Sequence, residues 1–182
     1  MNTPSLLEGL RFVDTFFPSG GYAFSAGLEA AVQSGAVKNA DQFARYIEDL
    51  LRGGMSHREA LAAKIANAAG STGQVSAALE IDRRLDATKL SRESRMASRQ
   101  MGRQVIRVAA DQIKAKPVLR EYHDEVESNR APGHLAVTLG LTLGACEWST
   151  EDTAAAFLYQ TAVGFVSAAM RLSPIGQHEG QC

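Results

Sequence analysis

The spacing of apolar residues along this chain predicts helices nearly throughout. Phe43, Ile47, Leu50 and Leu51 recur at i, i+4, i+7 and i+8, which places them on one face of a helix. No run of alternating β-branched residues continues for more than a few positions, so a sheet is not expected. No internal repeat or linker divides the chain. The pattern predicts an all-α fold, a single-domain helical bundle over residues 1–182.

Capping and turn residues divide this helical pattern into segments. Asn39 is expected to cap the helix that contains Phe43, and Gly53-Gly54 is expected to loosen its end. The stretch Gly70-Ser71-Thr72-Gly73 has the composition of a loop. Further helices are expected over residues 75–85, 91–110, 118–127 and 133–145, and a last one after Ser149.

The segment from Thr153 to Met170 is uncharged over its whole length. That length is near the lower limit for a membrane-spanning helix. Its polar residues and many alanines keep its mean hydropathy low, so we expect a buried helix and no membrane. Small residues on most of its sides let neighbouring helices approach closely. We therefore expect this segment to be the central, small-residue-rich helix of the bundle.

The composition is that of an ordinary globular domain, with 45% hydrophobic and 21% charged residues. The formal net charge is −1, so no global field attracts nucleic acid or an anionic membrane. Two cysteines, Cys146 and Cys182, are too few for a disulfide scaffold and fit a reducing compartment. No signal peptide is evident, so a cytoplasmic location is expected.

The strongest charge pattern is a stripe of arginines on the helix expected over residues 91–110. Its members are Arg92, Arg95, Arg99, Arg103 and Arg107, at spacings that keep them on one side. One interpretation is a docking surface for an acidic partner or a phosphate, because arginine forks bind carboxylates in a bidentate manner. Another is a solvated face paired with Glu80, Asp82, Glu93 or acids of a neighbouring helix. A third is a helical nucleic-acid-binding regulator that uses Arg92–Arg107.

No self-contained catalytic or metal-binding set stands out. Three candidate nucleophiles have no histidine and acid beside them along the chain: Ser25, Ser98 and Tyr159. His123 and Glu127 are four residues apart, as are His178 and Cys182, but a pair of ligands is a weak metal signal. The residues alone therefore give no catalytic, metal or cofactor site, and a metal-dependent enzyme whose ligands only folding assembles stays open as an alternative.

One short segment, Asp14–Glu29, combines features that the rest of the chain lacks. Its aromatic pair Phe16-Phe17 looks buried, a proline-led turn follows, and two adjacent glycines permit backbone conformations closed to other residues. Ser25 is expected to cap the next helix, which puts Glu29 in the first turn, where the helix dipole favours a carboxylate. Such a turn suggests a buried helix corner or a surface that holds a partner.

This segment, read D-T-F-F-P-S-G-G-Y-A-F-S-A-G-L-E, resembles the signature of the urease accessory protein UreF family. Two further segments agree in the same order. Leu85-Asp86-Ala87 followed by Ser91–Gly102 is similar to the family's central L-D-A…S-R-E-x-R-x-A-S…G helix. Arg171–Gln177 with Gly180-Gln181 resembles its C-terminal R-L-x-P-x-G-Q-x-x-G-Q motif. Three ordered motifs across nearly the whole chain make the resemblance specific.

The resemblance implies an all-α protein without enzymatic activity of its own. Members of the family act in urease maturation, where they associate with the accessory protein UreD (also called UreH) and the GTPase UreG on apo-urease and regulate GTP-dependent nickel delivery. The resemblance also implies a homodimer, with nickel and GTP handled by the complex. The tail that usually follows the second Gly-Gln of the family is missing after Cys182, so weaker partner binding is expected.

The resemblance and the arginine stripe together predict a small set of partner-contacting residues. These are Tyr22, Ser25, Glu29, Arg95, Arg99, Arg103, Arg171 and Gln177. The glycines of the first motif are expected mainly to set the fold. Glu29 and Arg171 are the strongest candidates for direct contact.

Overall fold

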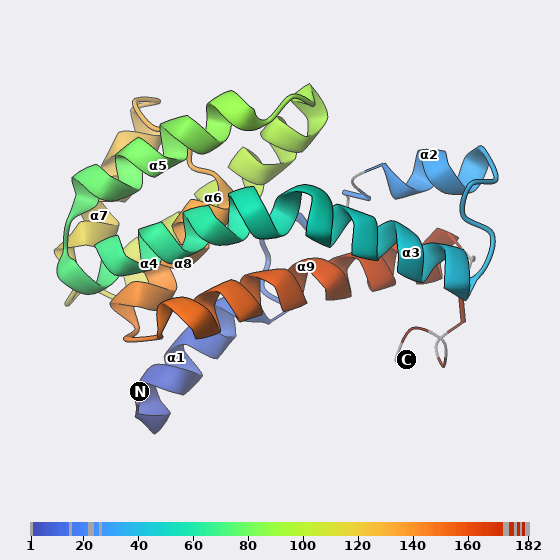
Figure 1. Ribbon diagram of the computed structural model, residues 1–182. Helices are drawn as coiled ribbons and strands as arrows, with labels where there is room; N and C mark the ends of the chain where they lie inside the picture. Colours follow the sequence, from blue (N-terminus) through green and yellow to red (C-terminus); the bar gives the residue numbers. More distant parts are fainter. Residues whose placement is uncertain are drawn as a thin grey trace.

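The computed structural model describes residues 2–14, 16–21, 24–25, 27–172, 175–176, 178 and 180. These residues form helices joined by turns and contain no strand, so the expected all-α bundle is confirmed (Figure 1). The elements are α1 (Thr3–Val13), α2 (Leu28–Gln33), α3 (Ala40–Leu50), η2 (Leu51–Ala60), α4 (Leu61–Thr72), α5 (Val75–Thr88), α6 (Arg92–Gln112), α7 (Pro117–Glu127), α8 (Leu135–Ala145) and α9 (Thr150–Leu172).

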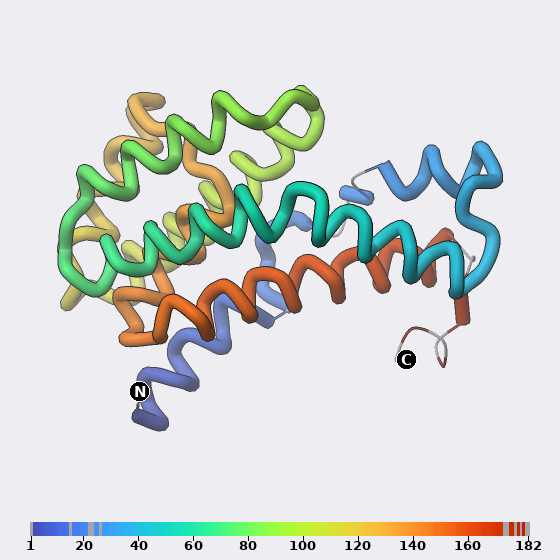
Figure 2. Tube along the Cα trace, in the orientation of Figure 1, coloured from blue at the N-terminus to red at the C-terminus, as the bar shows by residue number. Residues whose placement is uncertain are grey.

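Three consecutive helices form one rod, because α3, η2 and α4 follow one another without a turn. Helix α9 runs beside this rod in the opposite direction (Figures 1 and 2). Late in the rod, the Asn67 amide donates to the Thr153 hydroxyl at the start of α9, at 2.7 Å. Early in the rod, Phe43 lines a groove together with Val166. The rod and α9 thus define the long axis of the molecule.

The middle of the rod, η2, is a π-helix of 10 residues. The helix end expected at Gly53-Gly54 is therefore wrong, since the helix continues through both glycines in a wider form. A Cβ at Gly54 would lie 2.3 Å from the guanidinium of Arg58, a flexible side chain that can move away. Runs of π-helix are rare and often occur at functional sites.

The loop expected at residues 70–73 is also wrong, because α4 extends to Thr72 and ends at Gly73 in the left-handed conformation. Tertiary packing overrides the loop-like composition. A Cβ at Gly70 would lie 2.1 Å from the carbonyl oxygen of Leu141 on α8. Glycine is thus used here for close helix–helix approach rather than for a turn.

The centre of the bundle is α8, whose residues from Ala136 to Ala145 are all buried. Its Gly140 and Gly144 approach α4 so closely that an added Cβ would lie 2.3 and 2.0 Å from two carbonyl oxygens of that helix. A central helix with small residues is therefore present, but it is α8 and not the segment Thr153–Met170. Only 28% of the most apolar window of α9 is buried.

The buried side chains form two separate clusters. The larger one joins α1, the helices from α4 to α8 and the first half of α9, around side chains such as Phe12 and Leu139. The smaller one joins α2, α3 and the second half of α9, around Leu28 and Phe165. Helix η2 and the middle of α9 therefore connect two lobes that have their own cores.

Side-chain caps fix the starts of three helices, two of which the sequence predicts at Asn39 and after Ser149. Asn39, Ser91 and Ser149 each accept a hydrogen bond from the backbone N–H three residues further on, at 3.0, 3.2 and 3.0 Å. Each cap satisfies a backbone N–H that the helix itself leaves unpaired. Helix α8 begins at Leu135 rather than at residue 133, because its preceding N–H groups bind a buried carboxylate.

Candidate functional site

That carboxylate belongs to Asp82 on α5, which is 0% exposed. Its oxygens accept hydrogen bonds from the hydroxyl of Tyr122 (2.7 Å), the backbone N–H of Gly133 (2.7 Å) and the backbone N–H of His134 (3.0 Å). A buried carboxylate is tolerated when hydrogen bonds replace its hydration and when it meets a helix N-terminus. Burial and the adjacent carboxylate raise the pKa of Tyr122 well above its ordinary value. Asp82 therefore ties α5, α7 and the start of α8 together.

A second group of polar side chains continues this network toward α6. The ring of His134 contacts the hydroxyl of Ser98 through Nδ1 (3.1 Å) and the carboxylate of Asp86 through Nε2 (2.9 Å). Arg99 donates to the same Asp86 oxygen from Nε (3.1 Å) and Nη2 (2.5 Å). Burial lowers the pKa of His134 below its ordinary value, although Asp86 opposes the shift. Burial acts to raise the pKa of Asp86, but hydrogen bonds from Arg99 and His134 outweigh it and lower that pKa.

These contacts form a chain of the kind found in catalytic triads, with Ser98 in the place of the nucleophile, His134 in that of the base and Asp86 in that of the acid. The sequence analysis missed this arrangement, because its members are far apart along the chain and meet only through the packing of α5, α6 and α8. The geometry does not favour hydrolysis. Ser98 is 7% exposed and His134 is fully buried, and the Ser98 hydroxyl also accepts the backbone N–H of Leu135 at 3.3 Å. Buried and hydrogen-bonded in this way, the trio joins α5, α6 and the start of α8.

The arginine stripe is largely engaged within the chain. Arg95 donates to the carbonyl of Lys89 (2.6 Å), Arg99 binds Asp86 as described, and Arg103 donates to the side chain of Asn129 (2.7 Å). Those three arginines are half-buried, whereas the two outer members of the stripe are exposed. The pairing of Arg99 with an acid of a neighbouring helix agrees with the structural interpretation. A docking role for Arg95, Arg99 and Arg103 stays a prediction.

The opening segment differs from its expected form at two positions. Ser25 does not cap α2: Gly27 holds the capping position in the left-handed conformation, with φ of 92°, and the helix begins at Leu28. Phe16 is 93% exposed, whereas Phe17 packs against the ring of Phe12 with 5.4 Å between centroids. The aromatic pair is thus split between core and surface. One aromatic side chain remains available to a partner.

The remaining predicted contact residues lie at the two ends of the chain. Glu29 is in the first turn of α2 as expected, exposed, and accepts a hydrogen bond from the Gln33 amide at 3.3 Å. Arg171 is exposed in the last turn of α9. Tyr22 and Gln177 lie outside the described residues. Glu29 on α2 and Arg171 on α9 belong to helices that pack against each other, whereas the arginine stripe lies on α6.

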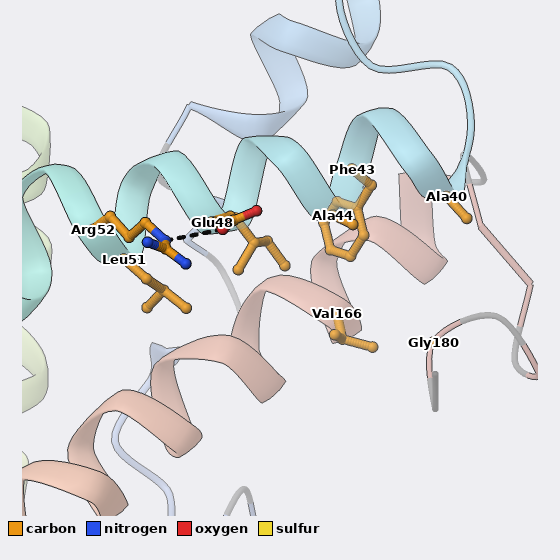
Figure 3. A pocket seen from close by; sticks show the side chains of 9 residues that line it. Ala40, Phe43, Ala44, Glu48, Leu51, Arg52, Val166 and Gly180 are labelled. Atoms are coloured by element: carbon orange, nitrogen blue, oxygen red, sulfur yellow. Dashed lines mark ion pairs between the residues drawn. The ribbon is translucent and has the colours of Figure 1, made fainter.

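An apolar groove lies between α3 and α9 and has a volume of about 390 Å³ (Figure 3). Phe43, Leu51 and Val166 contribute its apolar side chains, and the ion pair between Glu48 and Arg52, with 2.9 Å between its atoms, lies at the same groove (Figure 3). Sequence reasoning missed the groove because it depends on how the rod and α9 are aligned.

The groove continues into an apolar side of α9 that is only partly covered: Val163 and Val166 are half-buried, whereas Ala155, Tyr159 and Met170 are exposed. The residues of this surface, which we term the α9 face, are Ala155, Tyr159, Val163, Val166 and Met170, at spacings that place them on one side of the helix. Tyr159 is 69% exposed, and a Cβ at Gly164 would have no atom within 4 Å. By length and composition alone, α9 is the one helix in the described part of the chain that could cross a membrane.

The described residues contain no group of three or more histidine, cysteine, aspartate or glutamate side chains arranged to hold a metal ion. His123 lies 4.0 Å from Glu127 and 3.4 Å from Asp124. His178 is described but Cys182 is not, so their pairing as ligands stays untested.

Comparison with known proteins supplies the context for these surfaces. The sequence model of the family described as UreF matches residues 37–182. A protein named urease accessory protein UreF from Bacillus sp. (strain TB-90) is 29% identical over 97% of this chain and 77% of its own length. Proteins of the same name from Actinobacillus pleuropneumoniae serotype 3 (strain JL03) and Haemophilus influenzae (strain PittEE) are each 28% identical over 94% of this chain, covering 75% and 73% of their own lengths.

Proposed function

Because the chain belongs to the UreF family of urease accessory proteins, we propose that it is a non-catalytic urease maturation factor, a chaperone for nickel insertion. It assembles with an accessory protein of the UreD/UreH type and a GTPase of the UreG type on apo-urease. Within that assembly it regulates GTP-dependent nickel delivery. The complex handles nickel and GTP, and this chain needs no cofactor of its own. The assembly works in the cytoplasm.

The observation that best supports a binding role is the α9 face together with its groove. Large apolar side chains that stay exposed, as Tyr159 and Met170 do, are costly in water and can mark a protein–protein contact. The face carries no charged residue, so a partner need not supply a matching charge to bury it. The same property suits a second copy of this chain, because two uncharged faces meet without repulsion. We place a homodimer or an accessory-protein contact on this face.

A non-catalytic role agrees with the state of the polar groups. The strongest candidate for a nucleophile, Ser98, is buried and already hydrogen-bonded. A nucleic-acid-binding regulator is less well supported, because Arg95, Arg99 and Arg103 donate to groups of the chain itself. A DNA mobility shift would favour that alternative only if binding fell steeply with salt.

Size-exclusion chromatography with partners of the UreD/UreH and UreG types tests the proposal. We expect the chain to co-elute with them. Tyr159→Asp places a charge in the α9 face, so we expect it to lower the affinity for these partners about tenfold or more and to reduce co-elution. Met96→Asp is the matched control, because Met96 is 58% exposed on α6. Failure of the unmodified chain to co-elute would overturn the proposed function. Loss with Met96→Asp alone would move the interface to the arginine stripe.

A further inference from the structure

The two lobes of the molecule are joined more loosely than the helices within each lobe. The small lobe consists of α2, α3 and the second half of α9, and the large lobe contains the helices from α4 to α8 (Figure 1). Within the described residues, and leaving Tyr46 aside, no hydrogen bond or ion pair joins α2 or α3 to any helix from α4 to α8. Units with separate cores are expected to move relative to each other unless a large apolar interface holds them.

A cleft with a volume of about 340 Å³ separates the lobes on one side of the rod. Its small-lobe wall is the end of α3 with Asp49 and Leu50, and its large-lobe wall is the turn between α5 and α6 with Leu90 and the first residues of α6. Leu90 is 91% exposed, so α3 does not cover it. The cleft therefore leaves α3 room to approach this turn.

The rod passes from one lobe to the other in the first half of η2. The second half of η2 is tied to the large lobe, because Arg58 donates to the carbonyl of Thr88 at 3.2 Å and Glu59 pairs with the ammonium of Lys89 at 2.8 Å. The first half contains Gly53, where a Cβ would meet no atom within 4 Å. Helices bend most readily at glycines and at π-helical turns. We therefore expect the rod to bend at Gly53.

Helix α9 passes from one lobe to the other where it runs beside η2, which it contacts. The crossing lies between Phe157, which belongs to the larger buried cluster, and Phe165, which belongs to the smaller one. Between them, the hydroxyl of Thr161 donates to the carbonyl of Phe157 at 2.8 Å, a bond to the preceding turn that often bends helices. A Cβ at Gly164 would meet no atom within 4 Å. Both connections thus contain a helical glycine with open space beside it.

Each connection also holds a buried side-chain oxygen without a hydrogen-bond partner, namely Glu59 Oε2 in η2 and Gln160 Oε1 in α9. The amide nitrogen of Gln160, by contrast, donates to the carbonyl of Phe12 at 3.3 Å. An unpaired buried acceptor is costly, and water can pair it when the surrounding structure opens. Both oxygens therefore disfavour this arrangement of the lobes relative to one that lets water reach them.

We propose that the small lobe rotates relative to the large lobe about a hinge formed by Gly53 in η2 and Gly164 in α9, and that this motion opens and closes the cleft beside Leu90. The α9 face spans the hinge, since Tyr159 precedes Gly164 and Met170 follows it. A partner that covers the whole face therefore favours one arrangement of the lobes. Only this consequence rests on the proposed function. The hinge is a property of the isolated chain and is measured without partners, so its failure and that of the proposed function are separate results.

Distances between two spin labels, measured by double electron–electron resonance on the full chain, test the hinge. The inter-lobe pair is Asp41→Cys on α3 and Ala87→Cys on α5, both exposed, in a Cys182→Ser background that leaves only the buried thiol of Cys146. A bend of about 20° in the first half of η2 moves residue 41, about 18 Å away along the rod, by about 6 Å. We expect the distance distribution to be wider by about that amount than for Ala87→Cys with Glu121→Cys, a pair within the large lobe.

Gly53→Ala and Gly164→Ala test where the hinge lies, because each adds a methyl group in open space and reduces only the freedom of the backbone. Alanine favours regular helix, so each change should lower the bent population about fivefold, and the two together should narrow the inter-lobe distribution to the width of the control pair. Thr72→Ala raises helix propensity in the same rod outside the hinge and should change nothing. A parent distribution as narrow as that of the control pair would overturn the proposal. A wide distribution that the glycine variants leave unchanged, or that Thr72→Ala narrows equally, would overturn it as well.

Discussion

Replacing Gly144 with alanine should destabilise the protein, because α8 and α4 touch through glycine. A Cβ at this position would lie 2.0 Å from the carbonyl oxygen of Asn67, and ordinary contact begins near 3.4 Å. The obstacle is backbone, so no side-chain rotation relieves it. The two helices must separate locally by more than an ångström. Such a shift also disturbs the Asn67 amide, which donates to the Trp148 carbonyl (3.0 Å) and the Thr153 hydroxyl (2.7 Å).

The size of the effect follows from three contributions. Overpacking of a core costs about 1–3 kcal/mol, and weakening the hydrogen bonds of Asn67 costs about 1 kcal/mol more. The better helix propensity of alanine offsets about 1 kcal/mol. The free energy of unfolding should therefore fall by about 2 kcal/mol, which lowers the midpoint temperature by about 4–8 °C for a chain of this size.

Gly164→Ala is the matched control, since it makes the same change in another long helix. A Cβ there meets no atom within 4 Å, so only helix propensity changes and the protein should gain up to about 1 kcal/mol. Urea denaturation followed by far-ultraviolet circular dichroism measures both variants. The reasoning is refuted if Gly144→Ala is as stable as the parent protein, or if both variants shift stability in the same direction.

Three further outcomes are expected. Burial lowers the pKa of His134 below its ordinary value of 6.5, so the unfolded chain takes up a proton at a higher pH than the folded chain does. The free energy of unfolding should therefore decrease as the pH falls below 6.5. Urea midpoints measured across a pH series should show less of this decrease in His134→Gln. Burial raises the pKa of Cys146 to about 12, so in a Cys182→Ser background a thiol reagent at neutral pH should react only as fast as the protein opens. Asp82→Ala leaves the Tyr122 hydroxyl and two backbone N–H groups without their acceptor, and thermal melting should show a loss of about 3–5 kcal/mol.

Local signals in the sequence predicted most helix boundaries. Asn39, Ser91 and Ser149 cap helices because their side chains reach backbone N–H groups three residues away, an interaction that needs no tertiary contact. The errors fall on glycine. Gly53, Gly54 and Gly70 all lie inside helices. At Gly70 a Cβ would meet the backbone of α8, so glycine allows a close helix contact, whereas a Cβ at Gly53 would meet no atom within 4 Å. Composition alone cannot separate these uses from a turn.

The candidate sites were less predictable than the fold. The arginine stripe was visible as a spacing, but its engagement by Asp86 and Asn129 depends on α5 and on the turn that follows α7. The Ser98–His134–Asp86 contacts and both cavities arise from helix packing, which a single sequence does not specify. The family could be recognised from the sequence because three motifs in a fixed order can be read without knowing how the helices pack.

GTP-dependent activation of apo-urease by nickel, with purified UreD/UreH- and UreG-type partners, tests the central claim most directly. Urease activity should appear when this chain is present and should drop strongly when it is omitted or replaced by Tyr159→Asp. The chain alone should hydrolyse neither urea nor GTP. Equal activation without the chain, or appreciable hydrolysis by the chain alone, would contradict the proposal that it is a non-catalytic maturation factor.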